Sequence, residues 1–319
     1  MSAPRVGIIG ARRSHQGLGP FVARILTGVG AEVPAFSCTN EASVAEASEQ
    51  LQKLAGISAK GYADGERMLA DESLDAVAIL APPRAHRVWL ERALEAGLDV
   101  LCEKPFLWGA DDDLDRTLEI VDGFERAGLL LMENCQWPAT LPAFEQLHPE
   151  SQGEPLRRFA MRLAPASAGV EMIGDALPHP ISVLQALVPS KTVGIEEIHF
   201  STHADDASQL SVGFRYVADE QPVEVMIELS ASPGQPREAG LAVNGRWAHR
   251  VIRLRDYALF FASGAQVIDV PDPLVTHLET FVEALRADRP RVSAAENIRI
   301  RQRMSALDTL RRAFTRENT

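Results

Sequence analysis

The sequence predicts an α/β protein of two domains: a Rossmann-type, doubly wound parallel sheet, and then an α+β domain with a mostly antiparallel open sheet. The chain of 319 residues is long enough for two separate cores. Up to residue 125, short apolar runs alternate with helical patterns, which is typical of βαβ units. After about residue 150, apolar and polar positions alternate within the runs, as in antiparallel strands. We therefore expect domains at 1–125 and 126–319, with the C-terminal helix able to pack back on the first.

The first domain is expected to alternate strands and helices. Its predicted strands are Arg5–Ile9, Glu32–Ser37, Ala76–Leu80 and Asp99–Cys102, and a further strand, Leu129–Met132, follows them. Its predicted helices are Pro20–Gly28, Ala42–Ala55, Gly65–Ala70, Val88–Ala96 and Asp112–Ala127. Each helical run carries apolar residues at helical spacing between turn-forming residues.

The second domain is expected to consist mainly of strands. These are Arg157–Leu163, Glu196–Thr202, Leu210–Tyr216, Val223–Ser230, Leu241–Val243 and Ala248–Arg253. One helix is expected near Ile181–Leu187, and a long helix-like segment runs from Leu274 to Ala313. This order favours an open sheet with helices on one face.

Composition and charge exclude several classes of protein. An apolar content of 46% is that of an ordinary globular protein. The net charge of −12, without a lysine-rich run, argues against nucleic acid as a partner. Cys38, Cys102 and Cys135 lie far apart, which favours buried thiols in a reducing compartment. No run approaches the length of a membrane span, so we expect a cytoplasmic protein.

The loop after the first strand is a modified phosphate-binding turn. A Rossmann turn uses G-x-G-x-x-G so that the backbone can approach a pyrophosphate. Gly10 fits the first glycine, but Arg12 and His15 stand at the other two positions, and glycines return only at Gly17 and Gly19. One interpretation is a rebuilt loop in which Arg12 or Arg13 contacts phosphate. The alternative is that dinucleotide binding has been lost and both arginines are solvated.

The end of the second strand bears on the choice of cofactor. NAD-specific Rossmann domains place an acidic residue there for the ribose 2′-hydroxyl. Here Ser37-Cys38-Thr39 occupies that place. A small polar end with arginines nearby would accept a 2′-phosphate, which favours NADP. The alternative is that Glu41 or a backbone group binds the ribose of NAD.

Glu103-Lys104-Pro105 places a lysine at the carboxyl edge of a predicted buried strand, where open α/β sheets bind ligands. By itself such a lysine is more often structural. Together with Arg5–Gly10 and the segment Ala81-Pro82-Pro83-Arg84-Ala85-His86, however, the string resembles the glucose-fructose oxidoreductase / inositol dehydrogenase family of NAD(P)-dependent oxidoreductases. The resemblance is close over residues 5–135 and returns from Leu274 to Ala313. It implies an NADP or NAD cofactor held in part by Pro82, His86 and Glu103.

A second chemical signal is Asp175 and His179, which match the family's Asp-x-x-x-His element. The resemblance implies that Lys104 binds the reacting hydroxyl, His179 acts as the acid–base group and Asp175 orients the substrate or the imidazole. The pKa of histidine suits proton removal near neutrality. Pro178 and Pro180 flank His179, so a capping or core role for this histidine is the alternative.

Gln136 and Trp137 follow the last predicted strand of the first domain. They are suited to hydrogen-bond to and stack on a sugar-like ring, and packing at the domain junction is the equal alternative. The acidic run Asp111-Asp112-Asp113 is expected to cap the next helix, with no metal site.

These observations predict an NAD(P)-dependent oxidoreductase of a sugar, polyol or related small molecule. The alternative from another class is a nucleotide-binding regulator or scaffold on the same fold. The resemblance also implies a homodimer or homotetramer formed through the sheet of the second domain.

Overall fold

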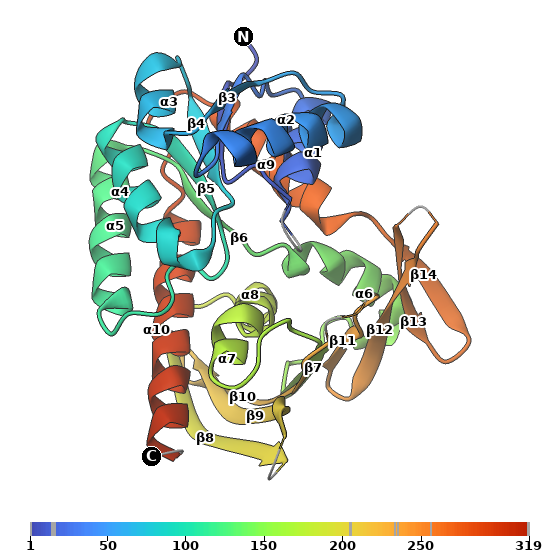
Figure 1. Cartoon of the computed structure of the whole chain (residues 1–319). Helices are drawn as coiled ribbons and strands as arrows, with labels where there is room; N and C mark the ends of the chain where they lie inside the picture. The colour runs from blue at the N-terminus through green and yellow to red at the C-terminus, as the bar shows by residue number, and fades with distance from the viewer. Residues whose placement is uncertain are drawn as a thin grey trace. The chain divides into compact units, whose positions relative to one another are not determined.

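The computed structural model describes residues 2–13, 17–203, 206–232, 234, 236–255 and 257–317, so His15 of the phosphate loop lies outside the described residues. The chain divides into two compact units, which are coloured along the chain in Figure 1. Unit 1 comprises Met1–Asn134 and Leu274–Arg301, and unit 2 comprises Cys135–Pro273 and Gln302–Thr319. No helix of the described residues is both long and apolar enough to cross a membrane.

Unit 1 contains a six-stranded sheet in which every pair of neighbours is parallel. Its strands are β1 (Val6–Ile9), β2 (Ala35–Ser37), β3 (Lys60–Tyr62), β4 (Ala76–Ile79), β5 (Asp99–Glu103) and β6 (Leu131–Asn134). The order β3-β2-β1-β4-β5-β6 is that of a Rossmann fold, so the predicted fold class of this part is confirmed. The strand order reverses between β1 and β4, which is where such sheets bind ligands.

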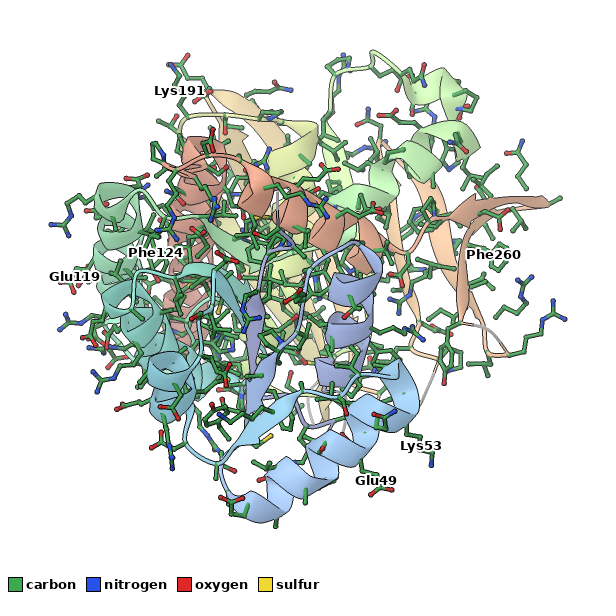
Figure 2. All side chains as sticks on the ribbon, turned by 90° about the horizontal axis from the view of Figure 1, so that it is seen from above. Glu49, Lys53, Glu119, Phe124, Lys191 and Phe260 are labelled. Atoms are coloured by element: carbon green, nitrogen blue, oxygen red, sulfur yellow. The ribbon has the colours of Figure 1, made fainter. Side chains whose placement is uncertain are left out.

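Helices cover both faces of this sheet. They are α1 (Gly19–Gly28), α2 (Glu41–Ala55), α3 (Gly65–Asp71), α4 (His86–Glu95), α5 (Asp113–Ala127) and α9 (Pro273–Arg286). One core unites the apolar faces of α1, α2 and α9 with side chains of β1 and β2. On the helices of the other face, Phe124 of α5 is buried whereas Glu119 projects outward (Figure 2). The same amphipathic arrangement places Glu49 and Lys53 on the outer side of α2 (Figure 2).

The returning C-terminal segment is fastened to unit 1 by a buried ion pair. Asp99 at the start of β5 is fully buried, and its Oδ2 lies 2.7 Å from Nη1 of Arg291. Its Oδ1 accepts a hydrogen bond from the backbone amide of Leu130 at 2.7 Å. Arg289 adds a second contact with Oδ2 at 3.6 Å. Asp99 therefore links the connection after α9 to the edges of β5 and β6.

Unit 2 contains an eight-stranded sheet in the order β14-β13-β12-β11-β7-β10-β9-β8. Only β7 and β10 are parallel neighbours, so the predicted mostly antiparallel sheet is confirmed. The strands are β7 (Arg158–Leu163), β8 (Val193–His203), β9 (Asp206–Ala218), β10 (Gln221–Ser230), β11 (Ala239–Val243), β12 (Arg246–Arg253), β13 (Ala258–Ser263) and β14 (Gln266–Val270).

One face of this sheet is covered by helices and the other is open. The helical elements are η2 (Trp137–Thr140), α6 (Leu141–Leu147), α7 (Glu171–Ala176), α8 (Pro178–Leu187) and the part of α10 (Ala294–Glu317) after Arg301. Alternate residues of β10 are buried and exposed, as expected for a strand covered on one side. Phe200 of β8 packs edge-on against Phe314 of α10, with ring centroids 5.1 Å apart.

Several elements differ from those predicted. The helix-like segment from Leu274 to Ala313 is two helices, because α9 ends at Arg286 and Pro290 lies in the connection before α10. The short edge strand β3 and the helices α6 and α7 were not predicted. The hairpin of β13 and β14 was also missed, although Ser263-Gly264 between two β-rich runs is a turn signal, and Gly264 has a positive φ of 58°.

Candidate active site

A pocket of about 460 Å³ opens in unit 1 at the carboxyl ends of β1, β2 and β4. These three strands are neighbours in the sheet, in the order β2-β1-β4. Ten residues line the pocket: Gly10, Arg12, Gly17, Cys38, Thr39, Ser43, Leu80, Ala81, Pro82 and Arg84. Its position is the point of reversed strand order at which Rossmann folds hold a dinucleotide. Arg84 and Ser43 were not among the predicted site residues.

Two glycines of the phosphate loop are required by the backbone geometry. Gly10 has a φ of +85°, and a Cβ there would lie 2.8 Å from the backbone nitrogen of Ala81. A Cβ at Gly19 would lie only 1.9 Å from the carbonyl oxygen of Ala11. Gly19 therefore lets α1 start directly against the end of β1, which is the task of the third glycine in the usual fingerprint. The loop is longer than usual, but it keeps this close approach.

The structure separates the two arginines of the loop. Arg12 lines the pocket, and its Nη1 lies 3.1 Å from Oε2 of Glu46 on α2. Arg13 is not among the lining residues; its guanidinium carbon lies 4.6 Å from the centroid of the Phe21 ring. Of the two candidates for a phosphate contact, Arg12 is therefore the one with access to the pocket.

The end of β2 contributes small polar groups. Ser37 is buried and does not line the pocket, whereas Cys38 and Thr39 do. The hydroxyls of Thr39 and Ser43 lie 3.4 Å apart. Burial raises the pKa of the Cys38 thiol, and the hydrogen bonds and charge of Arg12 only partly oppose this. Cys38 is therefore a neutral thiol, and none of the described residues that line the pocket is a carboxylate.

His86 was predicted to contact the cofactor, but in the structure it braces two loops. Its ring is buried, with Nε2 2.8 Å from the carbonyl oxygen of Ala81. Its Nδ1 lies 3.0 Å from the carbonyl oxygen of Pro105 and 3.2 Å from that of Phe106. Burial lowers the pKa of His86. Because both ring nitrogens face backbone oxygens, His86 fixes the loops after β4 and β5.

Lys104 lies directly after β5, beside a partly buried polar pair. Glu103 and Asn134 face each other across β5 and β6, and the Asn134 amide donates a hydrogen bond to the Glu103 carboxylate. Burial raises the pKa of Glu103, and the charge of Lys104 and the Asn134 hydrogen bond oppose that rise. Lys104 is half-buried at the same end of the sheet as the pocket.

In unit 2, His179 lies in the first turn of α8, with Asp175 in the short helix before it. The helix is interrupted because neither Pro178 nor Pro180 can donate a backbone hydrogen bond. Leu177, which lies between α7 and α8, keeps helical dihedral angles, with φ −71° and ψ −19°. Asp175 and His179 therefore remain one turn apart. Oδ2 of Asp175 accepts hydrogen bonds from the Ala166 amide at 3.2 Å and the Ser167 hydroxyl at 3.1 Å.

Trp137 links His179 to an arginine that the sequence did not single out. The ring of Trp137 is buried, and the ring of His179 lies 6.3 Å away, tilted by 55°. The guanidinium carbon of Arg250 lies 5.5 Å from the centroid of the same indole. The neighbouring Gln136 has a buried Oε1 without a hydrogen-bond partner among the described residues. Unit 2 thus gathers a histidine, an aromatic ring, an amide and a cation.

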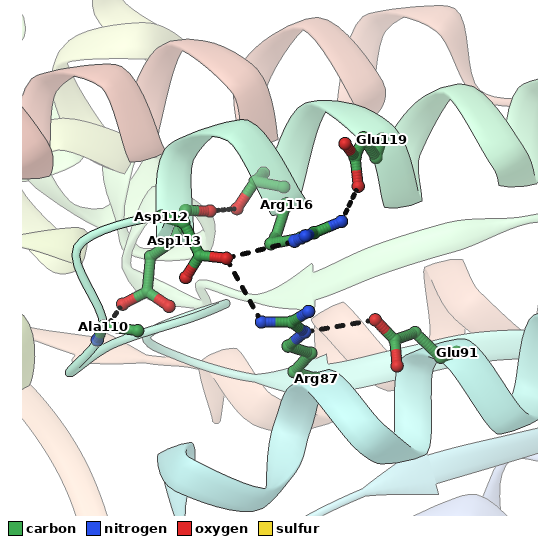
Figure 3. Close-up of polar contacts among 8 residues, drawn as sticks. Arg87, Glu91, Ala110, Asp112, Asp113, Arg116 and Glu119 are labelled. Carbon is green, nitrogen blue, oxygen red and sulfur yellow. Dashed lines mark hydrogen bonds and ion pairs between the residues drawn. The ribbon is translucent and has the colours of Figure 1, made fainter.

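The acidic run before α5 does not cap the helix as predicted. Asp112 is at the N-cap position, but its carboxylate accepts hydrogen bonds from Arg116 at 3.1 Å and Arg87 at 3.4 Å (Figure 3). Asp113 instead accepts a hydrogen bond from the Ala110 amide at 2.9 Å (Figure 3). The run therefore ties α5 to α4, because two arginines compete successfully for the capping oxygen.

Residues 5–135 match a family described as an oxidoreductase family with an NAD-binding Rossmann fold, abbreviated Gfo/Idh/MocA. The match covers 131 of the 319 residues, so the chain is similar to this family over about two fifths of its length. The match agrees with the resemblance found in the sequence, over the same residues 5–135, and the family it names has an NAD-binding Rossmann fold. The pocket of unit 1 lies wholly within the matched residues.

Two curated relatives are similar over parts of the chain. D-xylose 1-dehydrogenase (NADP(+)) 2 of Haloferax volcanii is 36% identical over 111 residues, which are 33% of this chain and 33% of the relative. A dTDP-3,4-didehydro-2,6-dideoxy-alpha-D-glucose 3-reductase of Saccharopolyspora spinosa is 41% identical over 69 residues, which are 22% of this chain and 20% of the relative. The matched segments thus span a third or less of these two relatives.

Solved structures with the same fold cover the whole chain. UDP-N-acetylglucosamine 3-dehydrogenase from Acidithiobacillus ferrooxidans superposes with a TM-score of 0.69 at 19% identity, covering 98% of each chain. A probable dehydrogenase from Thermotoga maritima superposes with a TM-score of 0.72 at 16% identity, covering 99% of this chain and 97% of that one. At these identities the likeness shows a shared fold alone.

Proposed function

We propose that the protein is an NAD(P)-dependent oxidoreductase that acts on a hydroxyl or carbonyl group of a sugar, polyol or related small molecule. The observation that carries the proposal is the pocket at the ends of β1, β2 and β4, with Gly10, Gly19 and Arg12 in its phosphate loop. The bound nicotinamide would supply the hydride chemistry. The protein would bind and orient the substrate and move its proton.

NADP is the cofactor that the pocket favours. Arg12 offers a cation, and Thr39 and Ser43 offer hydroxyls. These are groups that bind a 2′-phosphate, whereas an NAD-specific pocket carries a carboxylate for the 2′-hydroxyl. Glu46 is the nearby acid, but it is paired with Arg12. Glu41 remains the alternative partner for the ribose of NAD.

Lys104, His179 and Asp175 would carry out the acid–base chemistry. Oxidation of an alcohol requires removal of its hydroxyl proton, which His179 can accept near neutral pH. Lys104, held after β5 by the His86 brace on Pro105, would bind the reacting oxygen. Asp175 would position the histidine's turn through its hydrogen bonds to the 166–167 backbone and hydroxyl.

Gln136 and Trp137 would form one side of the substrate site. Gln136 has an acceptor atom whose hydrogen bond a sugar hydroxyl could complete. Trp137 offers an aromatic surface to the ring of a sugar.

The first experiment is a thermal unfolding titration with NADPH and NADH. A ligand at a hundredfold excess over its dissociation constant should stabilise the chain by about 2.7 kcal/mol. No stabilisation by either cofactor would exclude the oxidoreductase proposal.

Turnover separates the enzyme from its rival, a nucleotide-binding regulator or scaffold. Once a substrate is found in a panel of sugars and polyols, Lys104→Met and His179→Ala should each abolish most turnover while cofactor still binds. Binding of cofactor with no turnover on any member of the panel would favour the regulator.

We further propose that two copies associate through the open face of the unit 2 sheet and that the protein is cytoplasmic. Met226, Val251 and Val267 are 39%, 46% and 58% exposed, and they put apolar surface on a sheet that helices cover on its other side. The three cysteines are free thiols, as expected in a reducing compartment. Light scattering at several concentrations would test the association.

A further inference from the structure

Two arginines of unit 2 lie together beside Trp137. Arg250 lies on β12, on the same strand face as the buried Ala248, and Arg237 precedes β11. Nη2 of Arg250 donates a hydrogen bond to the carbonyl oxygen of Arg237 at 2.8 Å. The guanidinium carbon of Arg250 lies 5.5 Å from the centroid of the indole ring that also neighbours His179.

Both guanidinium groups have buried donors without partners. Among the described residues, Nε and Nη2 of Arg237 and Nε of Arg250 are buried and make no hydrogen bond. Within the same described residues, no carboxylate lies within ion-pair distance of either arginine. A buried charged donor without a partner is costly, so folded proteins pair such groups with a carboxylate, a bound ion or a ligand.

The two positive charges also act on each other. Burial and the charge of Arg237 both lower the pKa of Arg250. Arginine nonetheless stays protonated at all physiological pH values, so neither group can relieve the repulsion by losing its proton. An oxyanion would relieve it, because guanidinium donors match carboxylate and phosphate oxygens in geometry and charge.

Another arginine of the same sheet provides a contrast. Arg162 also lies against an indole, with its guanidinium carbon 4.6 Å from the centroid of the Trp247 ring. Its Nε lies 2.5 Å from a carboxylate oxygen of Glu228, and the pair is exposed. The stacked Arg162 thus has a carboxylate partner within the chain. Arg237 and Arg250 have none among the described residues, so a ligand could provide it.

We propose that Arg237 and Arg250 bind an oxyanion of the substrate, so that the substrate is a sugar or polyol carrying a carboxylate or a phosphate group. That the bound anion is a substrate rests on the proposed function, whereas the binding of an anion by the two arginines can be measured without turnover. In this site Arg237 and Arg250 hold the charged end, and Trp137 packs on the carbon skeleton. His179, whose ring lies 6.3 Å from the same indole, would act at the end that reacts.

The first test is a thermal unfolding titration of the full chain with inorganic phosphate at constant ionic strength. In phosphate-free buffer, Arg250→Met and Arg237→Met should unfold at a higher temperature than the wild type, because each removes an unpaired buried charge. Phosphate should raise the midpoint of the wild type. In each variant its affinity should fall by about 10- to 100-fold, as expected for the loss of a charged hydrogen bond.

Two control variants make the result specific. Arg162→Met removes a stacked but paired arginine and should leave the phosphate response unchanged. Arg12→Met removes the cation of the cofactor pocket, where phosphate can also bind, and should leave the part that depends on Arg250 intact. A phosphate response that disappears in Arg12→Met and persists in both Arg237→Met and Arg250→Met overturns the proposal. So does a loss of stability in Arg250→Met that is equal at all phosphate concentrations, since that is the result of a purely structural role. If Arg250→Met does not fold, Arg237→Met decides the titration.

The second test identifies the anion by titrating D-gluconate, D-glucose 6-phosphate and neutral D-glucose. If gluconate or glucose 6-phosphate binds at least tenfold more tightly than glucose, and this difference disappears in Arg250→Met, the anion is assigned as a carboxylate or a phosphate, respectively. Equal affinities for all three overturn the assigned substrate class. Failure of both NADPH and NADH to bind would exclude the oxidoreductase proposal without affecting either titration.

Discussion

Replacing Arg12 by methionine tests the structure of the cofactor pocket most directly. Methionine keeps the apolar stem and removes the charge and the donors. One hydrogen bond from a cation to phosphate contributes about 1.5–3 kcal/mol. Because the side chain of Arg12 is 43% exposed, solvent screening places the value near the lower end of that range. Arg12 must leave its exposed ion pair with Glu46 to contact the phosphate, which costs about 0–1 kcal/mol of the binding free energy. We therefore expect Arg12→Met to weaken NADPH binding about tenfold and NADH binding less than about threefold.

The assay is a fluorescence titration of each reduced cofactor, with Arg13→Met as the matched control. Arg13 is next in sequence but packs over Phe21, so its loss should leave both affinities unchanged. Glu46→Gln releases Arg12 from its ion pair and should strengthen NADPH binding slightly. Equal weakening of NADPH and NADH by Arg12→Met would refute the 2′-phosphate assignment. An effect of Arg13→Met as large as that of Arg12→Met would refute the separation of the two arginines.

Three further outcomes follow from the packing of unit 1. Gly19→Ala should abolish cofactor binding in a titration with NADPH, because its Cβ would lie 1.9 Å from the carbonyl oxygen of Ala11, and backbone cannot move aside cheaply. Asp99→Asn should destabilise the chain by about 3 kcal/mol in urea unfolding, because it leaves the partly buried Arg291 without its charged partner. Since burial raises the pKa of Glu103, the folded chain binds that proton more tightly than the unfolded chain does, and the stabilisation present at low pH is lost as the pH rises through the folded pKa. Glu103→Gln should therefore gain stability relative to the wild type as the pH rises above 4.5, the ordinary pKa of a glutamate, and a difference that does not change with pH would contradict the raised pKa.

The fold could be predicted because its signals are local. The apolar runs of β1, β4 and β5 are buried on both faces of a parallel sheet, so they appear in the sequence as continuous apolar segments. The strands of unit 2 are covered on one side, so β10 alternates strictly. The elements that were missed carry weak local signals: β3 has three residues and α7 has six. Their place in the fold is decided by contacts with distant segments, which periodicity does not reveal.

The candidate site could be predicted only where a residue type and its place in an element together imply a task. Lys104 after a buried strand and Gly10 at the end of β1 meet that condition. His86 shows the limit, since its position beside the pocket was visible in the sequence, but the two carbonyl oxygens that face its Nδ1 belong to a loop 19 and 20 residues away.

Arg237 and Arg250 lay beyond that limit altogether. An arginine on a strand most often has a carboxylate partner, as Arg162 has in Glu228, and the sequence cannot show that a partner is missing. Only folding brings Arg250 of β12, Arg237 before β11 and Trp137 of η2 together. An unpaired, buried charge in a folded chain is a cost that packing alone does not explain. It therefore points to a ligand that supplies the opposite charge, and a substrate that carries an oxyanion would supply it beside Trp137, the aromatic ring that also neighbours His179.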